Sequence, residues 1–270
     1  MQPKVLPTLS LLALIGSTAA RADGINPLDD RFSLSLGTFM LDTSTQIRVD
    51  GTTGRGTEID TERDLGLQDG DRFRADGYWR FAERHKVRVL YFDTDRSASK
   101  TLQRTIDVRD TVFPVDLTVD STFKTRVTEL AYEYAFLRGE NYEVAGTIGV
   151  HDLRFKLGLT ASQNSGQLAE LTRDADASGP LPVVGVRGVW RFHPNFYFDA
   201  QAQFFKISLD PYDGRLEDYN ASVVWAPFKH FGIGAGYNEF VTRLDVSADR
   251  FDGHLRWRYS GARIFITGSF

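Results

Sequence analysis

The stretch V-T-E-L-A-Y-E-Y-A-F-L-R-G-E-N at residues 127–141 decides the fold class. Its even-numbered positions up to 136 carry Thr, Leu, Tyr, Tyr and Phe, and its odd-numbered positions carry Val, Glu, Ala, Glu and Ala. This alternation is typical of a β-strand whose two faces meet different surroundings. The polar residues 138–141 then form a short turn directly after the aromatic residues. An aromatic beside a short turn indicates a strand that ends at a membrane–water interface.

The same pairing of aromatic residue and short turn recurs along the chain. The aromatic residues concerned are Trp79, Phe81, Tyr134, Phe136, Tyr142, Trp190, Phe192, Phe196, Phe198, Trp225, Phe228 and Phe231. Repeated at successive strand ends, such rings form the aromatic girdle of a membrane barrel. The pattern predicts an all-β fold, a transmembrane antiparallel up-and-down β-barrel.

The N-terminal residues 1–22 have the layout of a secretory signal peptide. Lys4 gives a basic start, residues 9–16 are largely apolar, and Ala20-Arg21-Ala22 is a small-x-small cleavage site. We therefore expect export to the bacterial outer membrane and a single barrel domain over residues 23–270. The absence of cysteine and a formal net charge of −4 fit an exported chain that does not bind nucleic acid.

Turn lengths predict about ten strands, with 8 and 12 as alternatives. The predicted strands are residues 31–49, 72–81, 86–97, 123–136, 142–155, 182–192, 196–208, 216–225, 231–243 and 251–270. Short turns alternate with longer polar segments at 50–70, 97–120, 161–180, 210–214 and 247–250. Outer-membrane barrels have short periplasmic turns and long external loops, so both termini should lie in the periplasm.

Two strands show an ambiguous pattern. In residues 251–259 the apolar positions are odd-numbered, whereas Ile264 and Ile266 are even-numbered. A β-bulge at Ser260-Gly261 would restore one lipid-facing side, and a tight turn there would instead add an eleventh strand. We expect the bulge, because the last strand must close antiparallel on the first. In residues 86–92 both parities carry apolar residues, which leaves the lipid face open.

The segment G-T-E-I-D-T-E-R-D-L-G-L at residues 56–67 resembles the G-T-x-I-D-x-E-x-D-L-G-L segment after the first strand of a group of uncharacterised proteobacterial outer-membrane β-barrel proteins. Arg80-Phe81 and Arg84-His85 similarly match their R-F-x-x-R-H strand end. The resemblance implies the fold and the compartment and transfers no functional residue. Asp60, Glu62 and Asp64 are interpreted as a solvated loop, with a cation site as the alternative.

If the aromatic face meets lipid, the other face lines the lumen. The predicted lumen or pore-lining residues are Arg72, Arg74, Asp76, Arg80, Glu129, Glu133, His151, Arg187, Arg191, Asp199, Asp218, His254, Arg256 and Arg258. In a barrel this narrow, opposed Arg and carboxylate groups can pair and block the lumen. The main hypothesis is therefore a largely self-paired lumen with a structural or narrow-channel role. The alternative is a pore for small polar solutes.

A lipid A-modifying enzyme is the third function class. Acyl transfer needs a nucleophile beside a base, but Ser260 follows His254 by a distance of about 20 Å along a strand. We therefore predict no catalytic residue, no metal ligand and no cofactor. The expected partners are outer-membrane lipid and lipopolysaccharide, and the barrel-assembly machinery through the C-terminal strand that ends at Phe270. The sequence leaves the oligomeric state open.

Overall fold

The computed structural model describes residues 24–51, 54, 56–68, 72–161, 171–209, 212–248 and 251–270. The predicted signal peptide lies outside the described residues. The long strands are β1 (Phe32–Asp50), β3 (Arg72–Ala82), β4 (His85–Thr101), β7 (Thr118–Arg138), β8 (Tyr142–Ala161), β9 (Leu171–His193), β10 (Phe196–Leu209), β11 (Tyr212–Phe228), β12 (Phe231–Ala248) and β13 (Phe251–Ser269). None of the helices in the described part of the chain is long and apolar enough to cross a membrane.

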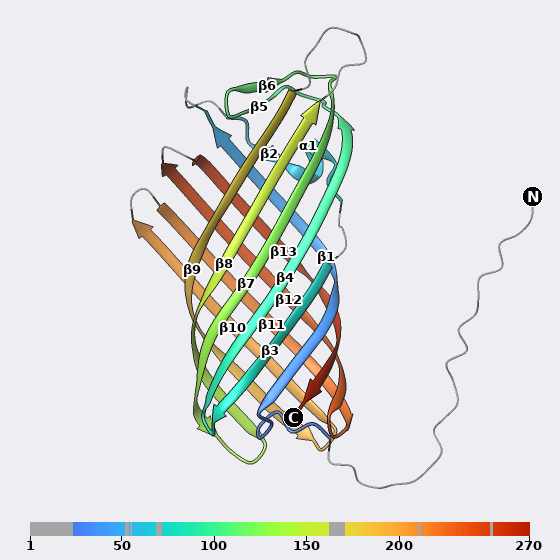
Figure 1. Ribbon diagram of the computed structural model, residues 1–270, viewed down its shortest axis with the longest axis vertical. Coiled ribbons are helices and arrows are strands. Elements are labelled where there is room, and N and C mark those ends of the chain that lie inside the picture. The colour runs from blue at the N-terminus through green and yellow to red at the C-terminus, as the bar shows by residue number, and fades with distance from the viewer. Residues whose placement is uncertain are drawn as a thin grey trace, which may run out of the picture.

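These ten strands form one closed antiparallel barrel (Figure 1). Each long strand pairs with the next along the chain, and β13 pairs with β1 from Ser269 opposite Ser33 to Asp252 opposite Asp50. Following the directly paired residues from strand to strand around the barrel leads from Phe32 of β1 back to Ser44 of the same strand. This offset means that the strands are staggered and tilted, as closure of a barrel requires. The prediction of a ten-stranded up-and-down barrel is confirmed.

The strands are longer than a bilayer requires. β7 has 21 residues and β9 has 23, whereas a tilted strand crosses a membrane in about 9–11 residues. The prediction of a loop over residues 161–180 is wrong from Leu171 onward, because β9 begins there. The four predicted short turns lie at one end of the barrel (Figure 1). The strands are long enough to extend past a bilayer at the other end.

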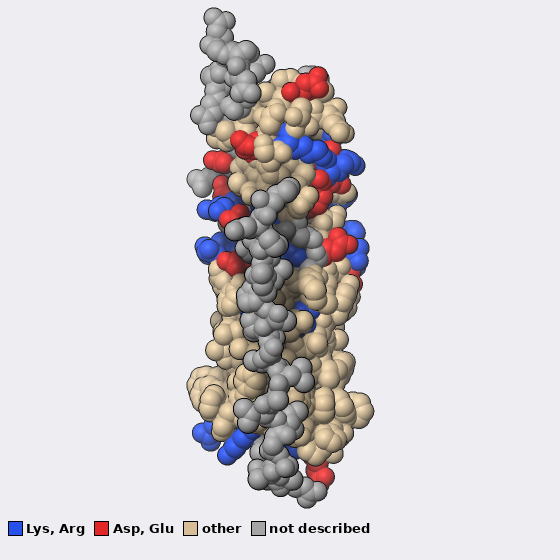
Figure 2. Space-filling view, turned by 90° about the vertical axis from the view of Figure 1, so that its right-hand side faces the viewer, with Lys and Arg blue, Asp and Glu red and all other residues tan. Residues whose placement is uncertain are grey.

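Two halves of the barrel differ in what faces outward. Toward the short turns the outward side chains are apolar, including Leu34, Leu130, Ile148, Val184, Ile233 and Ile266, which are 43–60% exposed. Beyond Phe73, Phe204 and Tyr219 the outward positions become charged, as with Lys124, Arg154 and Arg256. In the face shown by Figure 2, charged side chains gather in the upper part, above a mostly uncharged band. We call the part below these three aromatics the membrane half and the part above them the outer half.

A closed barrel with an apolar belt satisfies all its backbone groups and can span hydrocarbon. Trp79, Trp190 and Trp225 lie at the short-turn rim of this belt, and Phe204 and Tyr219 lie at its other rim. Belts flanked by two aromatic girdles are characteristic of bacterial outer-membrane barrels. The molecule is an integral outer-membrane barrel.

The predicted bulge at Ser260-Gly261 is wrong, and so is the alternative turn. β13 pairs with β12 and with β1 without a register shift across these residues. Leu255 and Trp257 are buried inside the outer half, whereas Ile264 and Ile266 face out from the membrane half. Odd-numbered side chains of β13 therefore face the lumen and even-numbered ones face outward along the whole strand. What changes along the strand is whether the outward side meets lipid or water. The same change explains residues 86–92, where Val89 faces out and Leu90 and Phe92 are buried inside.

The segment after β1 fills a gap in the wall. β3 ends its pairing with β1 at Arg74, although β1 continues to Asp50. In the uncovered region, β2 (Ile59–Asp60) pairs with β1 and leads into α1 (Thr61–Leu65). Glu62 of α1 accepts a hydrogen bond from the Thr45 backbone N–H at 2.9 Å and pairs with Arg96 of β4 at 2.5 Å. The Glu62 carboxylate thus connects β1 with β4 in the region where β3 does not extend between them.

This closing segment, residues 59–67, gives the predicted solvated loop a structural role. Ile59, Leu65 and Leu67 are buried in the core of the outer half. Asp60 caps α1 by accepting from the Arg63 backbone N–H, and Asp64 pairs with Arg104 at 2.6 Å. No group of three or more potential metal ligands was found among the described residues. Arg63 lies beside both Asp60 and Asp64, and Arg96 pairs with Glu62. The three carboxylates thus have cationic partners within the protein, which gives the cation alternative no support.

A small hairpin covers the outer end. β5 (Ile106–Val108) and β6 (Thr111–Phe113) are joined by Arg109 and Asp110, both with positive φ. Ile106 and Phe113 are fully buried against the core of the outer half, so the hairpin acts as its lid.

Candidate functional site: the lumen

The lumen of the membrane half contains most of the predicted polar residues. Those buried or half-buried inside it are Arg72, Arg74, Asp76, Arg80, Glu129, Glu133, His151, Arg187, Asp199 and Asp218. Arg191 is half-buried near the short-turn end of β9. Strand alternation alone places these side chains inside, since lipid covers the opposite face.

Three predicted lumen residues are wrong. Arg256 and Arg258 are exposed and alternate with buried Leu255 and Trp257, so they face out from the outer half. His254 belongs to the same outward set and lies 3.6 Å from Glu58. These residues were placed inside because the apolar side of β13 was taken as the lipid side over its whole length. In the outer half the apolar side is the interior.

At the short-turn end, Glu143 accepts from two cations. Its Oε2 atom lies 2.8 Å from Arg80 Nη1, and its Oε1 atom pairs with Lys86 Nζ. All three side chains are at most 4% exposed. A carboxylate with two cationic partners in this confined space is held in place by charge-assisted hydrogen bonds.

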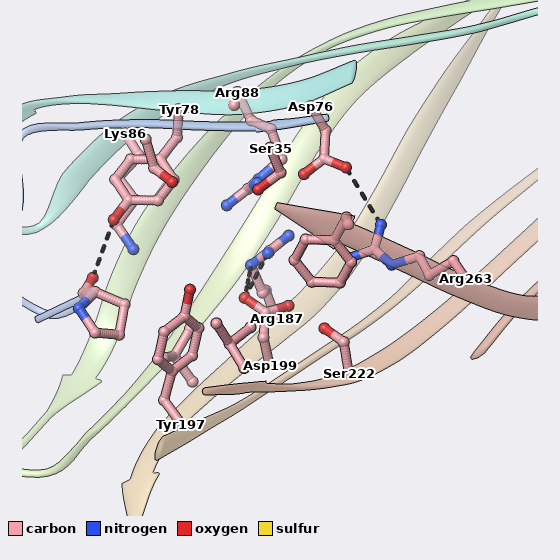
Figure 3. A pocket seen from close by; sticks show the side chains of 16 residues that line it. Ser35, Asp76, Tyr78, Lys86, Arg88, Arg187, Tyr197, Asp199, Ser222 and Arg263 are labelled. Atoms are coloured by element: carbon pink, nitrogen blue, oxygen red, sulfur yellow. Dashed lines mark hydrogen bonds and ion pairs between the residues drawn. The ribbon is translucent and has the colours of Figure 1, made fainter. Parts of the chain in front are cut away.

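The next layer surrounds a small polar cavity. Arg88 Nε donates to Glu133 at 2.8 Å, and Arg187 pairs with Asp199 at 2.5 Å. The cavity has a volume of about 30 Å³, which is room for a water molecule or two. Figure 3 shows Arg88, Arg187, Tyr78 and Tyr197 directed toward this space, from strands on opposite sides of the barrel.

Above the cavity lies a layer centred on Asp76 and Asn238. Asp76 pairs with Arg74 at 3.0 Å and with Arg263 at 3.2 Å. Arg74 also donates to Asn238 Oδ1 at 3.0 Å, and Asn238 donates to Asp218 at 2.7 Å. These contacts join β3, β11, β12 and β13, which belong to one stretch of the wall with β1 between β3 and β13.

A fourth polar group contains the single inward histidine of the described strands of the membrane half. Gln203 Nε2 donates to Glu129 at 2.6 Å, and His151 Nε2 lies 3.0 Å from Gln203 Oε1 and 3.6 Å from Glu129. His151 is fully buried and its ring lies 5.9 Å from that of Phe240. In the described chain, the side chains within hydrogen-bond or ion-pair distance of His151 are a carboxylate and an amide.

The lumen of the outer half is filled by rings. Phe92, Phe240, Trp257 and Tyr259 are at most 2% exposed and stack or tilt on one another with centroids 5.0–6.4 Å apart. Phe155 contacts Trp257 edge-on at 5.2 Å. Dense aromatic packing of this kind fills the interior of the outer half at this level. It closes the barrel above the polar layers.

The N-terminal residues 24–31 close the other end. Ile25 and Leu28 are 2% exposed and pack against Val189, Tyr197 and Val224 of the wall. Arg80 donates to the Pro27 carbonyl at 3.0 Å, and Arg138 donates to the Leu28 carbonyl at 2.7 Å. We call residues 24–31 the N-terminal plug, because they occupy the mouth between the short turns.

Sequence reasoning missed several members of the polar layers. Lys86 and Arg88 lie in the strand whose faces were left open, and Arg263 lies beyond the expected bulge. A correct choice of face in β4 would have found Lys86 and Arg88, whereas Arg263 already alternates with Ile264 and Ile266, which the expected bulge leaves on the lipid side. The plug carried no sequence signal, because Ile25 and Leu28 stand alone between polar residues. Gly234 makes room for a neighbouring ring, because a Cβ at this position would lie 2.1 Å from the Phe265 ring.

No protein-family model and no curated protein matches the chain. Among solved structures, it is similar to the attachment invasion locus protein Ail of Yersinia pestis, with 14% identity and a TM-score of 0.37 over 89% of this chain and 97% of Ail. The toluene transporter TbuX of Ralstonia pickettii has 10% identity and a TM-score of 0.37 over 89% of this chain and 90% of TbuX. The outer membrane protein AlkL has 10% identity and a TM-score of 0.34 over 95% of this chain and 97% of AlkL. All three TM-scores are below 0.5, so they add nothing to what the strand register shows.

Proposed function

We propose that the protein is a closed, non-conducting outer-membrane barrel with a structural role, which holds its rigid outer half above the membrane surface. The observation that carries this proposal is the filling of the lumen along the described chain, which leaves a polar cavity of about 30 Å³. The N-terminal plug, three ion-paired or hydrogen-bonded layers and the aromatic core follow one another from end to end. Interactions available to a functional partner are therefore on the outside.

A narrow channel is the second candidate, and the cavity on the inner side of the plug favours it. Its wall contains Lys86, Arg88, Asp76 and Asp199, so it offers both signs of charge to a small solute. Opening it to the periplasm would require the plug to leave. Opening it to the outside would further require the rings around Phe240 to separate, which opposes conduction.

Conductance measurements test the proposal. We expect purified wild-type protein in a planar bilayer to show no discrete current steps. Glu133→Gln, which leaves Arg88 without its close carboxylate, should lower stability, because a buried charge loses its partner. Glu140→Gln, in an exposed turn, is the matched control and should change neither property.

Two outcomes separate the candidates. Discrete wild-type conductance from protein shown to be folded by heat-modifiable mobility would overturn the closed-barrel proposal. If its ion selectivity also changed in Glu133→Gln, the channel candidate would replace it, because the carboxylate would then line the path.

We also propose export through a cleaved signal peptide and recognition of β13 by the barrel-assembly machinery. Support comes from the seam: the Phe270 backbone N–H donates to Phe32 at 2.9 Å, and the exposed Phe270 ring stacks on His230 at 4.7 Å. Phe270→Ala should reduce the amount of assembled protein in outer-membrane fractions. An unchanged amount would contradict recognition through this residue.

A further inference from the structure

Four basic residues face each other across four neighbouring strands of the outer half. Lys206 of β10 is directly opposite Arg215 of β11, Arg215 is opposite Arg243 of β12, and Arg243 is opposite Arg256 of β13. All four are exposed. Their neighbours Leu216, Thr242 and Leu255 are buried, so the row lies on the outside of the barrel. We call these four residues the basic row.

The basic row is electrostatically unfavourable by itself. Directly opposite residues in an antiparallel sheet have Cβ atoms about 4.5–5.5 Å apart, and like charges at such pairs destabilise the sheet. Arg215 pairs with Glu217 of its own strand. Within the described part of the chain, Lys206, Arg243 and Arg256 have neither a hydrogen bond nor an ion pair from their side chains. Exposed Asp213 and Asp245 lie opposite each other, one outward-facing position from Arg215 and Arg243. The positive charge that the row retains is therefore concentrated at its two ends, Lys206 and Arg256.

The opposite side of the outer half shows how the same sheet avoids this situation. There Asp95 is opposite Lys124, Lys124 is opposite Lys156, and Lys156 is opposite Asp176. Each end of this row is acidic, and Lys124 pairs with Asp95 at 2.7 Å. On the same two strands Arg126 is opposite Arg154, and these two residues also have acidic neighbours, Asp93 and Asp152. We call the four basic residues Lys124, Arg126, Arg154 and Lys156 the balanced patch, because acidic residues adjoin them. Four consecutive cations are thus not a general property of this surface.

The position of the basic row relates it to the membrane. Lys206 lies one outward-facing position above Phe204, whose ring contacts Tyr219 edge-on at 5.5 Å at the upper rim of the apolar belt. From Lys206 the row rises along the staggered strands away from the belt. It begins where lipid headgroups begin and continues into the layer of their attached sugars.

We propose that the basic row binds the phosphate groups of an outer-leaflet glycolipid of the lipid A type. The proposal rests on the outer-membrane placement given above and names the residues that contact the lipid. Guanidinium groups bind phosphate oxygens through two parallel charge-assisted hydrogen bonds. Bound phosphates would neutralise the repulsion within the row, and the acyl chains would continue down the belt past Phe204.

Binding of lipid A by a fourfold variant tests the proposal. In Lys206→Gln, Arg215→Gln, Arg243→Gln and Arg256→Gln combined, affinity for lipid A in phosphatidylcholine nanodiscs should fall by at least roughly a hundredfold, since each basic residue at an anionic surface contributes about fivefold. The matched control replaces the four residues of the balanced patch by Gln and should retain wild-type affinity. Equal losses in both variants would overturn the proposal.

Thermal unfolding gives a second readout that is independent of folding yield. Without lipid A, the basic-row variant should unfold at a higher temperature than wild type, because repulsion is removed. Adding lipid A should raise the unfolding temperature of wild type but not that of the variant. A basic-row variant less stable than wild type in the absence of lipid A would contradict the proposed repulsion.

Further ligands separate the sources of phosphate. Dephosphorylated lipid A, phosphatidylglycerol and inorganic phosphate should each raise the wild-type unfolding temperature much less than lipid A. An equal rise with any of them would overturn recognition of phosphates on a glycolipid. Absence of lipid A binding would leave the conductance measurement unaffected. A failure of the lipid A proposal is therefore distinguishable from a failure of the closed-barrel proposal.

Discussion

In the membrane half, Leu130 and Ile148 face out while Glu133 and Arg88 are buried inside; in the outer half of the same strands, Lys124 and Arg154 face out while Phe92, Phe155 and Trp257 are buried. The backbone is continuous between the halves, and each strand keeps the same face toward the lumen. The two halves are therefore one barrel with opposite arrangements of polarity.

The difference follows from the solvent on the outer surface. Water around the outer half favours exposed charges and drives apolar side chains inward, as in a soluble barrel. Lipid around the membrane half requires an apolar exterior, and the interior then contains polar groups that satisfy one another. The outer half consequently closes the lumen by packing, and the membrane half closes it by ion pairs.

The largest expected effect is in the interior of the outer half. Phe92 is fully buried, with Tyr259 at 5.1 Å and Phe39 at 5.6 Å. Phe92→Ala should lower the free energy of unfolding by about 3–5 kcal/mol, through lost burial and the cavity left behind. Urea unfolding in detergent micelles measures it. Lys124→Ala, on the exterior at a nearby level, should change stability by less than about 0.5 kcal/mol. Similar effects at both positions would contradict the inverted arrangement.

A charge on the belt tests the membrane half. Leu130 is 53% exposed and lies between Val89 and Val150 of the neighbouring strands. Leu130→Arg should cost roughly 2–4 kcal/mol, the cost of an Arg near the bilayer midplane. The same change at exposed Thr122, on the outer half of the same strand, should be nearly neutral. Refolding equilibria into lipid vesicles compare the two, and a neutral Leu130→Arg would place this face in water.

The smallest effect concerns acid sensitivity of the closing segment. Partial burial opposes ionisation of Asp64, but hydrogen bonds from Arg63 and Arg104 lower its pKa overall. A lowered folded-state pKa means that this stabilisation is present above the ordinary Asp value of about 3.9 and is lost as pH falls through the lower value. Hydrogen exchange of residues 61–67 should increase in that range. Asp64→Asn should show faster exchange already at neutral pH. Unchanged exchange in this variant would contradict a stabilising role of Asp64 in the closing segment.

Some features followed directly from local sequence patterns. The aromatic residues beside residues 138–141 and the other short turns predicted the strand number and the short-turn end, because a girdle position needs only one ring near a turn. Glu129 and Glu133 were placed inside by alternation with Leu130 and Tyr132. The resemblance of residues 56–67 to other outer-membrane barrels stays a prediction, although their role in closing the wall is now described.

The sequence by itself determined the barrel, its order of strands and the alternation of faces, because these depend on period-two patterns and turn lengths that are local. Only the tertiary structure decided which face is inside at each level, since an apolar side chain in a strand is equally suited to lipid and to a packed core. That decision moved Arg256 and Arg258 outside and brought Lys86 and Arg88 in. It also placed the N-terminal plug and aligned the basic row, because both depend on contacts between segments that are distant in the chain.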